Sequence, residues 1–302
     1  MSKKQHTVII ITGPTASGKT ALAIQLAQRF NTEIISADSR QCYKELNIGV
    51  AKPSAKELQL VKHHFISSHS IHDNVTAQVF ETYALNAVDK IFQKSRVAVM
   101  AGGTGLYVKA FCEGLDEMPA IDPIVRSKIQ NAYEIKGLSW LQHEVQSQDP
   151  LFWSQAEQQN PQRLMRALEV KLATGKSFTD FRRGNKKDRD FNIITLGIQL
   201  PKDVLYSYIN TRTDQMLKEG LIDEVASLLS WQNVNALQTV GYKEIFAALK
   251  NEMPVSGAVE KIKQNTRHYA KRQLTWFRKM DGIIWGNSDE LLSWIDENLA
   301  FQ

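Results

Sequence analysis

The sequence predicts an α/β fold in which helices flank a parallel β-sheet and an all-helical segment interrupts the core. Three observations support this prediction. An apolar run at residues 8–11 leads into a glycine-rich loop, strand and helix patterns alternate as far as residue 114, and a strand pattern returns at residues 191–200. Such alternation is typical of parallel sheets, because each crossover between two parallel strands needs a covering helix.

The glycine-rich loop fits the phosphate-binding pattern GxxxxGK[ST]. A buried-strand pattern precedes it and a run of strong helix formers, residues 21–27, follows it, which is the context the pattern requires. Backbone N–H groups and the positive helix end would hold a diphosphate, Lys19 would add a positive charge, and Thr20 would offer its hydroxyl to Mg²⁺. We therefore predict a P-loop NTPase-like core and assign diphosphate binding to Gly13, Pro14, Thr15, Ala16, Ser17, Gly18, Lys19 and Thr20.

The other elements of the core follow from short apolar runs and helical periodicity. Residues 33–36 predict the second strand, residues 97–100 the third, and residues 79–92 the crossover helix between them. A second glycine-rich turn, residues 102–105, follows the third strand at the sheet edge where ligands collect in such folds. After the strand at residues 191–200 we expect helices to the end of the chain, the longest patterns being 203–229 and 257–279.

Residues 115–190 contain no strand-like apolar run and predict helices only. We interpret them as a helical insertion domain, with residues 1–114 and 191–302 forming the catalytic core. The net charge is +5, and residues 162–189 hold nine Lys or Arg against three acidic residues, while residues 261–280 hold seven and no acid. Such concentrations indicate a polyanionic partner, whereas solvated helix faces are the equally simple alternative for either segment.

Composition is that of an ordinary globular protein, with 43% apolar and 23% charged residues. Cys42 and Cys112 are the only cysteines, and we expect both to be free thiols in a reducing compartment. No apolar stretch approaches the ~18 residues that a membrane span needs. We therefore expect a cytoplasmic protein, monomeric by default, without a membrane partner.

Asp38 follows the second strand and would lie at the carboxyl edge of the sheet, near the phosphate-binding loop. A carboxylate there could take a proton from a nucleophile, or hold Mg²⁺ through water. Equally, an Asp or Ser before a helix could cap free N–H groups. Position alone leaves both readings open.

Taken together, the motifs resemble those of the tRNA dimethylallyltransferases, also called tRNA isopentenyltransferases. The resemblance runs almost end to end and rests on residues 13–20, 38–41, 48–53, 102–107, 160–170, 238–244 and 269–278. It implies transfer of a dimethylallyl group from dimethylallyl diphosphate to the exocyclic N6 amine of the adenosine 3′ to the anticodon, position 37 of tRNA. Cys42 and Val50 depart from the family pattern, without bearing on a catalytic role.

The resemblance also implies roles for single residues. Asp38 would act as general base, Thr20 would hold Mg²⁺, and Arg212 would reach the diphosphate. The contacts to the tRNA anticodon stem-loop would come from Asp38, Ser39, Arg40, Gln41, Thr104, Arg126, Gln162, Arg163, Leu164, Met165 and Arg166. The target base would have to leave its stack, at a cost of a few kcal/mol. We further expect backbone phosphate contacts from the late basic stripe Arg267, Lys271 and Arg278, with Trp276 in the core.

Three other functions fit part of the pattern. A small-molecule kinase would use the same loop for ATP, but the third strand lacks the terminal Asp that usually grips Mg²⁺ in nucleotide hydrolases. An adenylate isopentenyltransferase would not need the basic insertion, and a noncatalytic nucleic-acid-binding module would not need the phosphate loop. The histidines lack an acidic or cysteine ligand set, and we expect loop or surface positions for His63, His64, His69 and His72.

Overall fold

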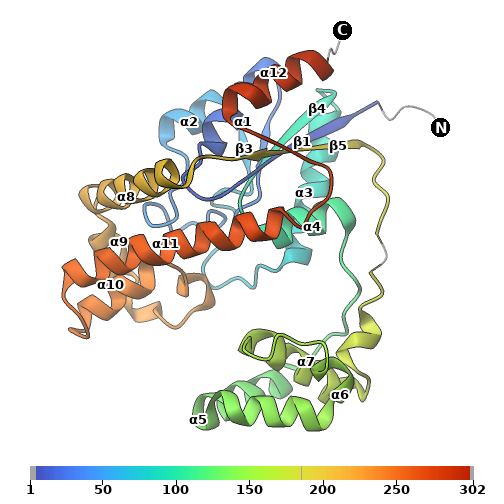
Figure 1. The fold of residues 1–302 in the computed structure, drawn as a ribbon, viewed down its shortest axis with the longest axis vertical. Helices are drawn as coiled ribbons and strands as arrows, with labels where there is room; N and C mark the ends of the chain where they lie inside the picture. Colours follow the sequence, from blue (N-terminus) through green and yellow to red (C-terminus); the bar gives the residue numbers. More distant parts are fainter. Residues whose placement is uncertain (1–4, 185, 300–302) are drawn as a thin grey trace. The chain divides into compact units, whose positions relative to one another are not determined.

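The computed structural model describes residues 5–184 and 186–299. The chain divides into two compact units. The core unit comprises Met1–Cys112 and Asp188–Gln302, and the insertion unit comprises Glu113–Lys187. Figure 1 shows the sheet and its covering helices in the first unit and a group of helices in the second.

The core unit is built on a six-stranded sheet whose strand pairs are all parallel, in the order β3-β2-β4-β1-β5-β6. The strands are β1 (Thr7–Thr12), β2 (Ile34–Ser36), β3 (His63–His64), β4 (Val97–Ala101), β5 (Asn192–Ile198) and β6 (Ile283–Gly286). Because β1 pairs with both β4 and β5, the loop that follows β1 emerges at the middle of the carboxyl edge. Ligands of open parallel sheets bind at this edge.

Helices cover both faces of the sheet. Their bounds are α1 (Lys19–Arg29), α2 (Ala55–Leu60), α3 (Ala77–Phe92), α4 (Gly105–Glu113), α8 (Lys202–Lys218), α9 (Leu221–Ser227), α10 (Tyr242–Leu249), α11 (Val255–Phe277) and α12 (Ser288–Asn298), with short 3₁₀ turns at η2 (Leu229–Trp231) and η3 (Asn235–Leu237). Alternate residues of β1 face opposite sides, so Ile9 and Ile11 pack with α1 and α12, whereas Val8 and Ile10 pack with α3 and α4.

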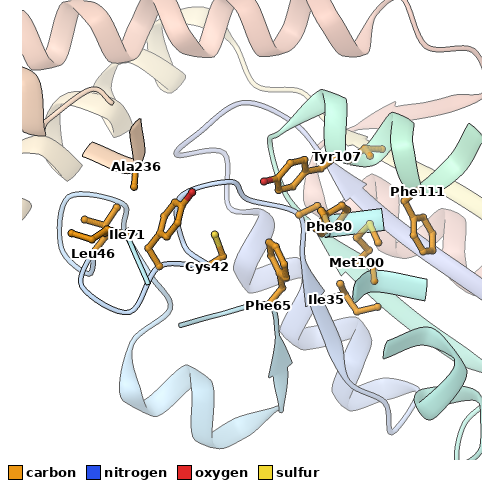
Figure 2. Packing of buried hydrophobic residues seen from close by; sticks show 14 of the residues in the cluster. Ile35, Cys42, Leu46, Phe65, Ile71, Phe80, Met100, Tyr107, Phe111 and Ala236 are labelled. Carbon is orange, nitrogen blue, oxygen red and sulfur yellow. The ribbon is translucent and has the colours of Figure 1, made fainter. Parts of the chain in front are cut away.

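The buried side chains on the two faces of the sheet form two apolar clusters. The larger one, on the face with Val8 and Ile10, supports the carboxyl edge of the sheet. Figure 2 shows its aromatic centre, where Phe65 meets Phe80 edge-on at 5.1 Å and Phe80 stacks on Tyr107 at 4.4 Å between ring centroids. Cys42 is a buried free thiol in the same cluster, and burial raises its pKa to about 12. The thiol is therefore an apolar filler rather than a nucleophile.

The insertion unit is helical and has a core of its own. It contains α5 (Pro123–Gln148), α6 (Pro150–Trp153), α7 (Pro161–Thr174) and the 3₁₀ helix η1 (Phe178–Phe181). A positive φ of 75° at Gly137 breaks α5 into two helical segments. Buried side chains of α5 and α7, including Leu141 and Leu168, form the apolar cluster that holds the unit together.

Three expectations from the sequence were wrong. The chain does not continue only as helices after β5, because the four-residue strand β6 adds to the sheet edge. The pattern at residues 203–229 is two helices, because Gly220 adopts a left-handed φ of 100° between α8 and α9. His63 and His64 form the edge strand β3 rather than a loop, and both are half-buried.

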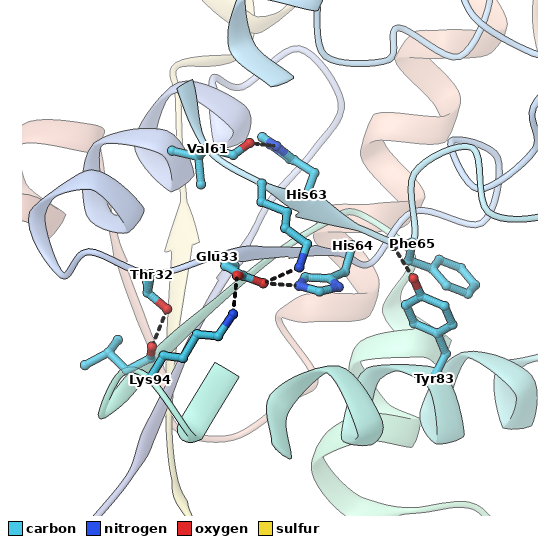
Figure 3. Close-up of polar contacts among 10 residues, drawn as sticks. Thr32, Glu33, Val61, His63, His64, Phe65, Tyr83 and Lys94 are labelled. Carbon is cyan, nitrogen blue, oxygen red and sulfur yellow. Dashed lines mark hydrogen bonds and ion pairs between the residues drawn. The ribbon is translucent and has the colours of Figure 1, made fainter. Parts of the chain in front are cut away.

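His64 also has an acidic neighbour, which the sequence did not suggest. Its Nε2 lies 2.5 Å from Glu33, and the same carboxylate bonds Lys62 at 3.1 Å (Figure 3). These contacts join β3 to β2. Over the described residues, no group of three or more His, Cys, Asp or Glu side chains has metal-binding geometry. Nor does any described helix have the length and apolar character needed to cross a bilayer.

Candidate active site

The phosphate-binding loop turns sharply out of β1 into α1. Gly13 and Gly18 have φ values of 144° and 89°, and a Cβ on Gly13 would lie 3.0 Å from the carbonyl oxygen of Ile198. Both positions therefore need glycine. Helix α1 begins at Lys19, so its free N–H groups and positive end point into the loop.

Lys19 is held against its own loop. Its Nζ donates a 2.6 Å hydrogen bond to the carbonyl oxygen of Pro14. Burial and, to a lesser extent, the positive charge of Arg212 together lower the pKa of Lys19 to about 7, although the charge of Asp38 acts in the opposite direction. A buried ammonium beside a second cation is a site that favours an anion.

Two hydroxyl groups of the loop have no hydrogen-bond partner among the residues that the structure describes. Ser17 is 5% exposed, and its Oγ is buried with no hydrogen-bond partner among the described residues. Thr20 lies half-buried in the first turn of α1, and its hydroxyl bonds no other residue that the structure describes. An orphaned buried hydroxyl costs free energy until a ligand or water satisfies it. A hydroxyl at this position is a hard oxygen donor suited to Mg²⁺.

Asp38 lies two residues beyond β2, at the same edge of the sheet. Its Oδ1 accepts hydrogen bonds from the backbone N–H groups of Arg40 at 2.9 Å and Gln41 at 3.3 Å. The carboxylate therefore caps a turn, and the helix that the capping interpretation expected here is absent, because the next described helix begins only at Ala55. No described residue hydrogen-bonds its second oxygen, which leaves that oxygen available for a ligand.

The second glycine-rich turn fixes the position of the Asp38 turn. A Cβ on Gly102 would lie 2.1 Å from the carbonyl oxygen of Ala37, so the two turns touch through their backbones. Thr104 then accepts a 3.0 Å hydrogen bond from the backbone N–H of Ser39. Tyr269 on α11 lines the cavity with the Asp38 turn, and burial raises the pKa of its hydroxyl.

Arg212 on α8 reaches the phosphate-binding loop from the other side. Its guanidinium donates to Thr15 Oγ1 and to the carbonyl oxygen of Ala51, both at 3.4 Å. Burial lowers the pKa of Arg212, and the charge of Asp38 opposes that effect. Long hydrogen bonds to neutral groups leave this cation able to take a stronger, anionic partner.

Thr15 and Ala16 of the phosphate-binding loop, the Asp38 turn and Arg212 line one cavity of about 530 Å³. Its walls come from the phosphate-binding loop, the Asp38 turn, α8, α11 and the loop before α10, and include Thr15, Asp38, Arg212, Val240, Tyr269 and Arg272. The structure thus brings together Asp38, Arg212 and the loop that the sequence singled out. It adds Tyr269 and residues 238–241, whose motifs were visible in the sequence but carried no predicted role.

Of the predicted RNA contacts in the core unit, Gln41 is the most constrained. Its side-chain amide donates to the carbonyl oxygens of Ala51 at 3.0 Å and Val50 at 3.3 Å, so it supports the loop beside Arg212. Arg40 donates to the carbonyl oxygen of Asn235 at 3.1 Å. Ser39 and Arg40 line the cavity together with Asp38.

The predicted RNA contacts of the insertion unit lie on or near α7. Gln162 and Arg163 are exposed, whereas Leu164 and Met165 are buried in the core of the unit. Their side chains hold α7 in place. Arg126 and Arg166 both pair with the buried carboxylate of Glu169, at 3.3 Å and 3.1 Å, which positions the two guanidinium groups side by side.

The basic stripe of Arg267, Lys271 and Arg278 is only partly exposed. Arg267 donates a 2.9 Å hydrogen bond to Asn210 and lies over the Tyr206 ring, whereas Lys271 and Arg278 are exposed. Trp276 is half-buried against Gly105, where an added Cβ would lie 2.1 Å from the indole. Its indole N–H is buried and unpaired within the described part of the chain.

Comparison with known proteins gives a consistent picture. A family model described as IPP transferase matches residues 41–280. The chain is similar to a tRNA dimethylallyltransferase of Christiangramia forsetii, with 46% identity over 283 residues, covering 94% of each chain. It is similar to the crystal structure of the full-length tRNA isopentenylpyrophosphate transferase from Bacillus halodurans, with a TM-score of 0.71, 33% identity, and coverage of 98% of this chain and 96% of that chain. A eukaryotic dimethylallyltransferase acting on tRNA aligns with a TM-score of 0.76 and 26% identity, over 97% of this chain and 76% of that one.

Proposed function

Because the chain belongs to the tRNA dimethylallyltransferase family, an IPP transferase family of enzymes, we propose that it transfers the dimethylallyl group of dimethylallyl diphosphate to N6 of adenosine 37 in tRNA. The observation that carries this proposal is the single cavity shared by an anion-binding loop, Arg212 and the carboxylate of Asp38. The diphosphate leaving group and its proton acceptor, the carboxylate of Asp38, would therefore face the same cavity.

The phosphate-binding loop and Arg212 would bind the diphosphate. The carbon–oxygen bond of the substrate breaks as the allylic carbon becomes cation-like, and the departing diphosphate gains negative charge. Lys19, Arg212 and the N–H groups at the start of α1 stabilise that charge, because they are fixed before the reaction begins. The orphaned hydroxyl of Ser17 supports a ligand in this loop.

Mg²⁺ fits the oxygen donors of the loop. Thr20 would hold it, together with oxygens of the diphosphate and water. When bound, the ion supplies positive charge to the leaving group. The residues of the chain orient the diphosphate whether or not the ion contributes further.

Asp38 would act as the base. The adenine amine attacks the allylic carbon, a nitrogen–carbon bond forms, and the proton of the amine passes to the carboxylate oxygen that bonds no described residue. The backbone bonds to Oδ1 keep the carboxylate oriented while the reaction proceeds. Capping and catalysis are therefore compatible roles for the two oxygens of one side chain.

The anticodon stem-loop would contact both units. In the core unit Ser39 and Arg40 belong to the Asp38 turn and line the cavity, and Thr104 bonds the backbone of Ser39. In the insertion unit Arg126, Arg163 and Arg166 supply positive charge near the exposed Gln162. Such contacts would offset the free energy needed to extrude the target base.

The direct test is a mass measurement. The protein is incubated with dimethylallyl diphosphate, Mg²⁺ and an unmodified anticodon stem-loop, and the RNA is weighed. We expect a gain of one dimethylallyl group that disappears when the target adenosine is replaced by another base. AMP serves as the competing acceptor. No gain on RNA, or a faster gain on AMP, would contradict the proposal.

A further inference from the structure

Gln273 on α11 is a buried polar residue. It belongs neither to the diphosphate cradle, which is the phosphate-binding loop together with Arg212, nor to the Asp38 turn. Its side chain is 6% exposed. The Oε1 atom accepts a 2.8 Å hydrogen bond from the backbone N–H of Thr15, and the Nε2 atom donates a 2.9 Å hydrogen bond to the carbonyl oxygen of Gly103. One amide thus joins the phosphate-binding loop to the second glycine-rich turn.

Each hydrogen-bond partner of Gln273 is in turn connected to a residue of the proposed reaction, Thr15 to Arg212 and Gly103 to the Asp38 turn. Thr15 receives the guanidinium of Arg212 on its hydroxyl. Gly103 precedes Thr104, whose hydroxyl accepts the backbone N–H of Ser39, the residue beside Asp38. Gln273 therefore connects the phosphate-binding loop, on the side of Arg212, to the turn that holds Asp38, in addition to the contact that Arg212 and Gln41 share at Ala51.

The fit around the amide is close. A Cβ added to Gly103 would lie 2.1 Å from Nε2 of Gln273, so the turn can receive the donor only because residue 103 is glycine. The hydrogen bond to Gly103 is buried and the one to Thr15 is partly buried, so losing the first would leave a buried acceptor unsatisfied and losing the second a partly shielded donor. A side chain with both a donor and an acceptor is required, which is the chemistry of glutamine.

We propose that Gln273 is a positioning residue that sets the distance between the diphosphate cradle and the Asp38 turn, so that the adenine amine, rather than water, captures the allylic carbon. This inference rests on the proposed function. When water captures the carbon instead, its oxygen forms the new bond, the carbon–oxygen bond to diphosphate breaks, and the products are dimethylallyl alcohol, diphosphate and the proton that the water releases to solvent. A displacement of about 1 Å in such a site lowers a rate by about 100-fold.

The test uses two substitutions and a control on the same helix. Gln273→Glu keeps the volume and the acceptor for Thr15 but places an oxygen against the carbonyl of Gly103. Gln273→Met removes both bonds at similar length. Gln264→Glu, at an exposed position of α11, is the matched control. The measured quantities are the single-turnover rate of RNA prenylation, the dissociation constant for the diphosphate, and the ratio of dimethylallyl alcohol to prenylated RNA.

We expect both Gln273 variants to lose about 10- to 100-fold in prenylation rate, as displaced reacting groups do. The alcohol-to-RNA ratio should rise severalfold, diphosphate affinity should stay within about threefold, and Gln264→Glu should resemble the unmodified protein. A mere loss of stability would scale both products together and would lower the melting temperature. An unchanged ratio with a folded protein overturns the inference. If the unmodified protein itself gives no prenylated RNA, the proposed function fails instead.

Discussion

At the scale of single residues, the site depends on positive charges and hydroxyl groups whose positions suit an anionic ligand. Lys19 rests on a carbonyl oxygen of its own loop, Arg212 makes only long hydrogen bonds, and Ser17 has a buried hydroxyl without a described partner. None of these arrangements is strong in itself. Each becomes favourable when a diphosphate supplies negative oxygens.

The lowered pKa of Lys19 gives a prediction about protons. Near pH 7 the free protein has a partly neutral Lys19, because burial and the charge of Arg212 disfavour the ammonium. An anion in the loop would raise that pKa, so binding should take up a proton between about pH 7 and 9, and affinity should fall as pH rises through this range.

Calorimetric titration with a nonhydrolysable dimethylallyl diphosphate analogue, in buffers of different ionisation enthalpy, measures this uptake. The Lys19→Met variant measures the protons taken up by the ligand itself. Uptake that is the same in both proteins across the pH range would contradict the assignment of the proton to Lys19.

At the scale of elements, α9 and α10 hold a loop that the site needs. Glu224 on α9 accepts backbone hydrogen bonds from Asn47, Ile48 and Gly49 at 2.8–3.1 Å. It also accepts a 2.6 Å bond from the Tyr242 hydroxyl of α10. The loop held in this way ends at Ala51, whose carbonyl oxygen receives both Gln41 and Arg212.

Replacing Glu224 by Gln should therefore affect both the stability of the protein and the binding of diphosphate, although Glu224 does not line the cavity. The new amide places a donor among backbone donors, which we expect to lower the free energy of unfolding by about 1–3 kcal/mol. Because the loop positions Arg212, diphosphate affinity should also fall. Urea denaturation and ligand titration measure the two effects, with the exposed neighbour Asp223→Asn as the control. Equal stability of the two variants would show that the bonds to the loop contribute little.

The elements that could be predicted from the sequence are those with local signals. Strand β1, the phosphate-binding loop and α1 are contiguous and carry a spacing that few other structures share. Strand β6 has only four residues and follows a long helix, so its apolar run looked like part of a helical pattern. The break at Gly220 is a single left-handed residue between two runs with the same periodicity.

The roles of Gln273 and Glu224 could not be predicted in this way. Gln273 bonds a residue 258 positions away, and Glu224 bonds residues about 176 positions away. Gln273 falls within the motif at residues 269–278, but the local sequence of neither residue shows which backbone groups it bonds. Their contacts follow from the packing of α9 and α11 against the loops, which only the fold determines.

At the scale of the whole molecule, the chain separates a chemical unit from a basic helical unit. The cavity with Asp38, Arg212 and the phosphate-binding loop lies within the core unit. The insertion unit has its own apolar core and carries the arginines that pair with Glu169. We propose that the first unit performs the reaction and that the second contributes affinity for RNA.

This division predicts that the affinity for RNA depends strongly on salt concentration and that the rate of prenyl transfer depends on it only weakly. Affinity for the anticodon stem-loop should fall at least about tenfold between roughly 50 and 200 mM salt, because several phosphate contacts release counterions. Arg163→Ala, at an exposed position of α7, should reduce both the affinity and its salt slope. Fluorescence anisotropy of labelled RNA measures these quantities. An affinity that hardly changes with salt would refute the role given to the basic surfaces.

The central claim is that the carboxylate of Asp38 removes the amine proton within the cavity that also holds the diphosphate. The most direct measurement is the single-turnover rate of RNA prenylation by Asp38→Asn, with RNA affinity determined in parallel and the exposed Asp89→Asn as the control. We predict a loss of about 100- to 10,000-fold in rate and a change of less than about threefold in affinity, because the amide keeps the shape of the side chain. A rate close to that of the unmodified protein, or a loss of affinity as large as the loss of rate, would contradict the claim.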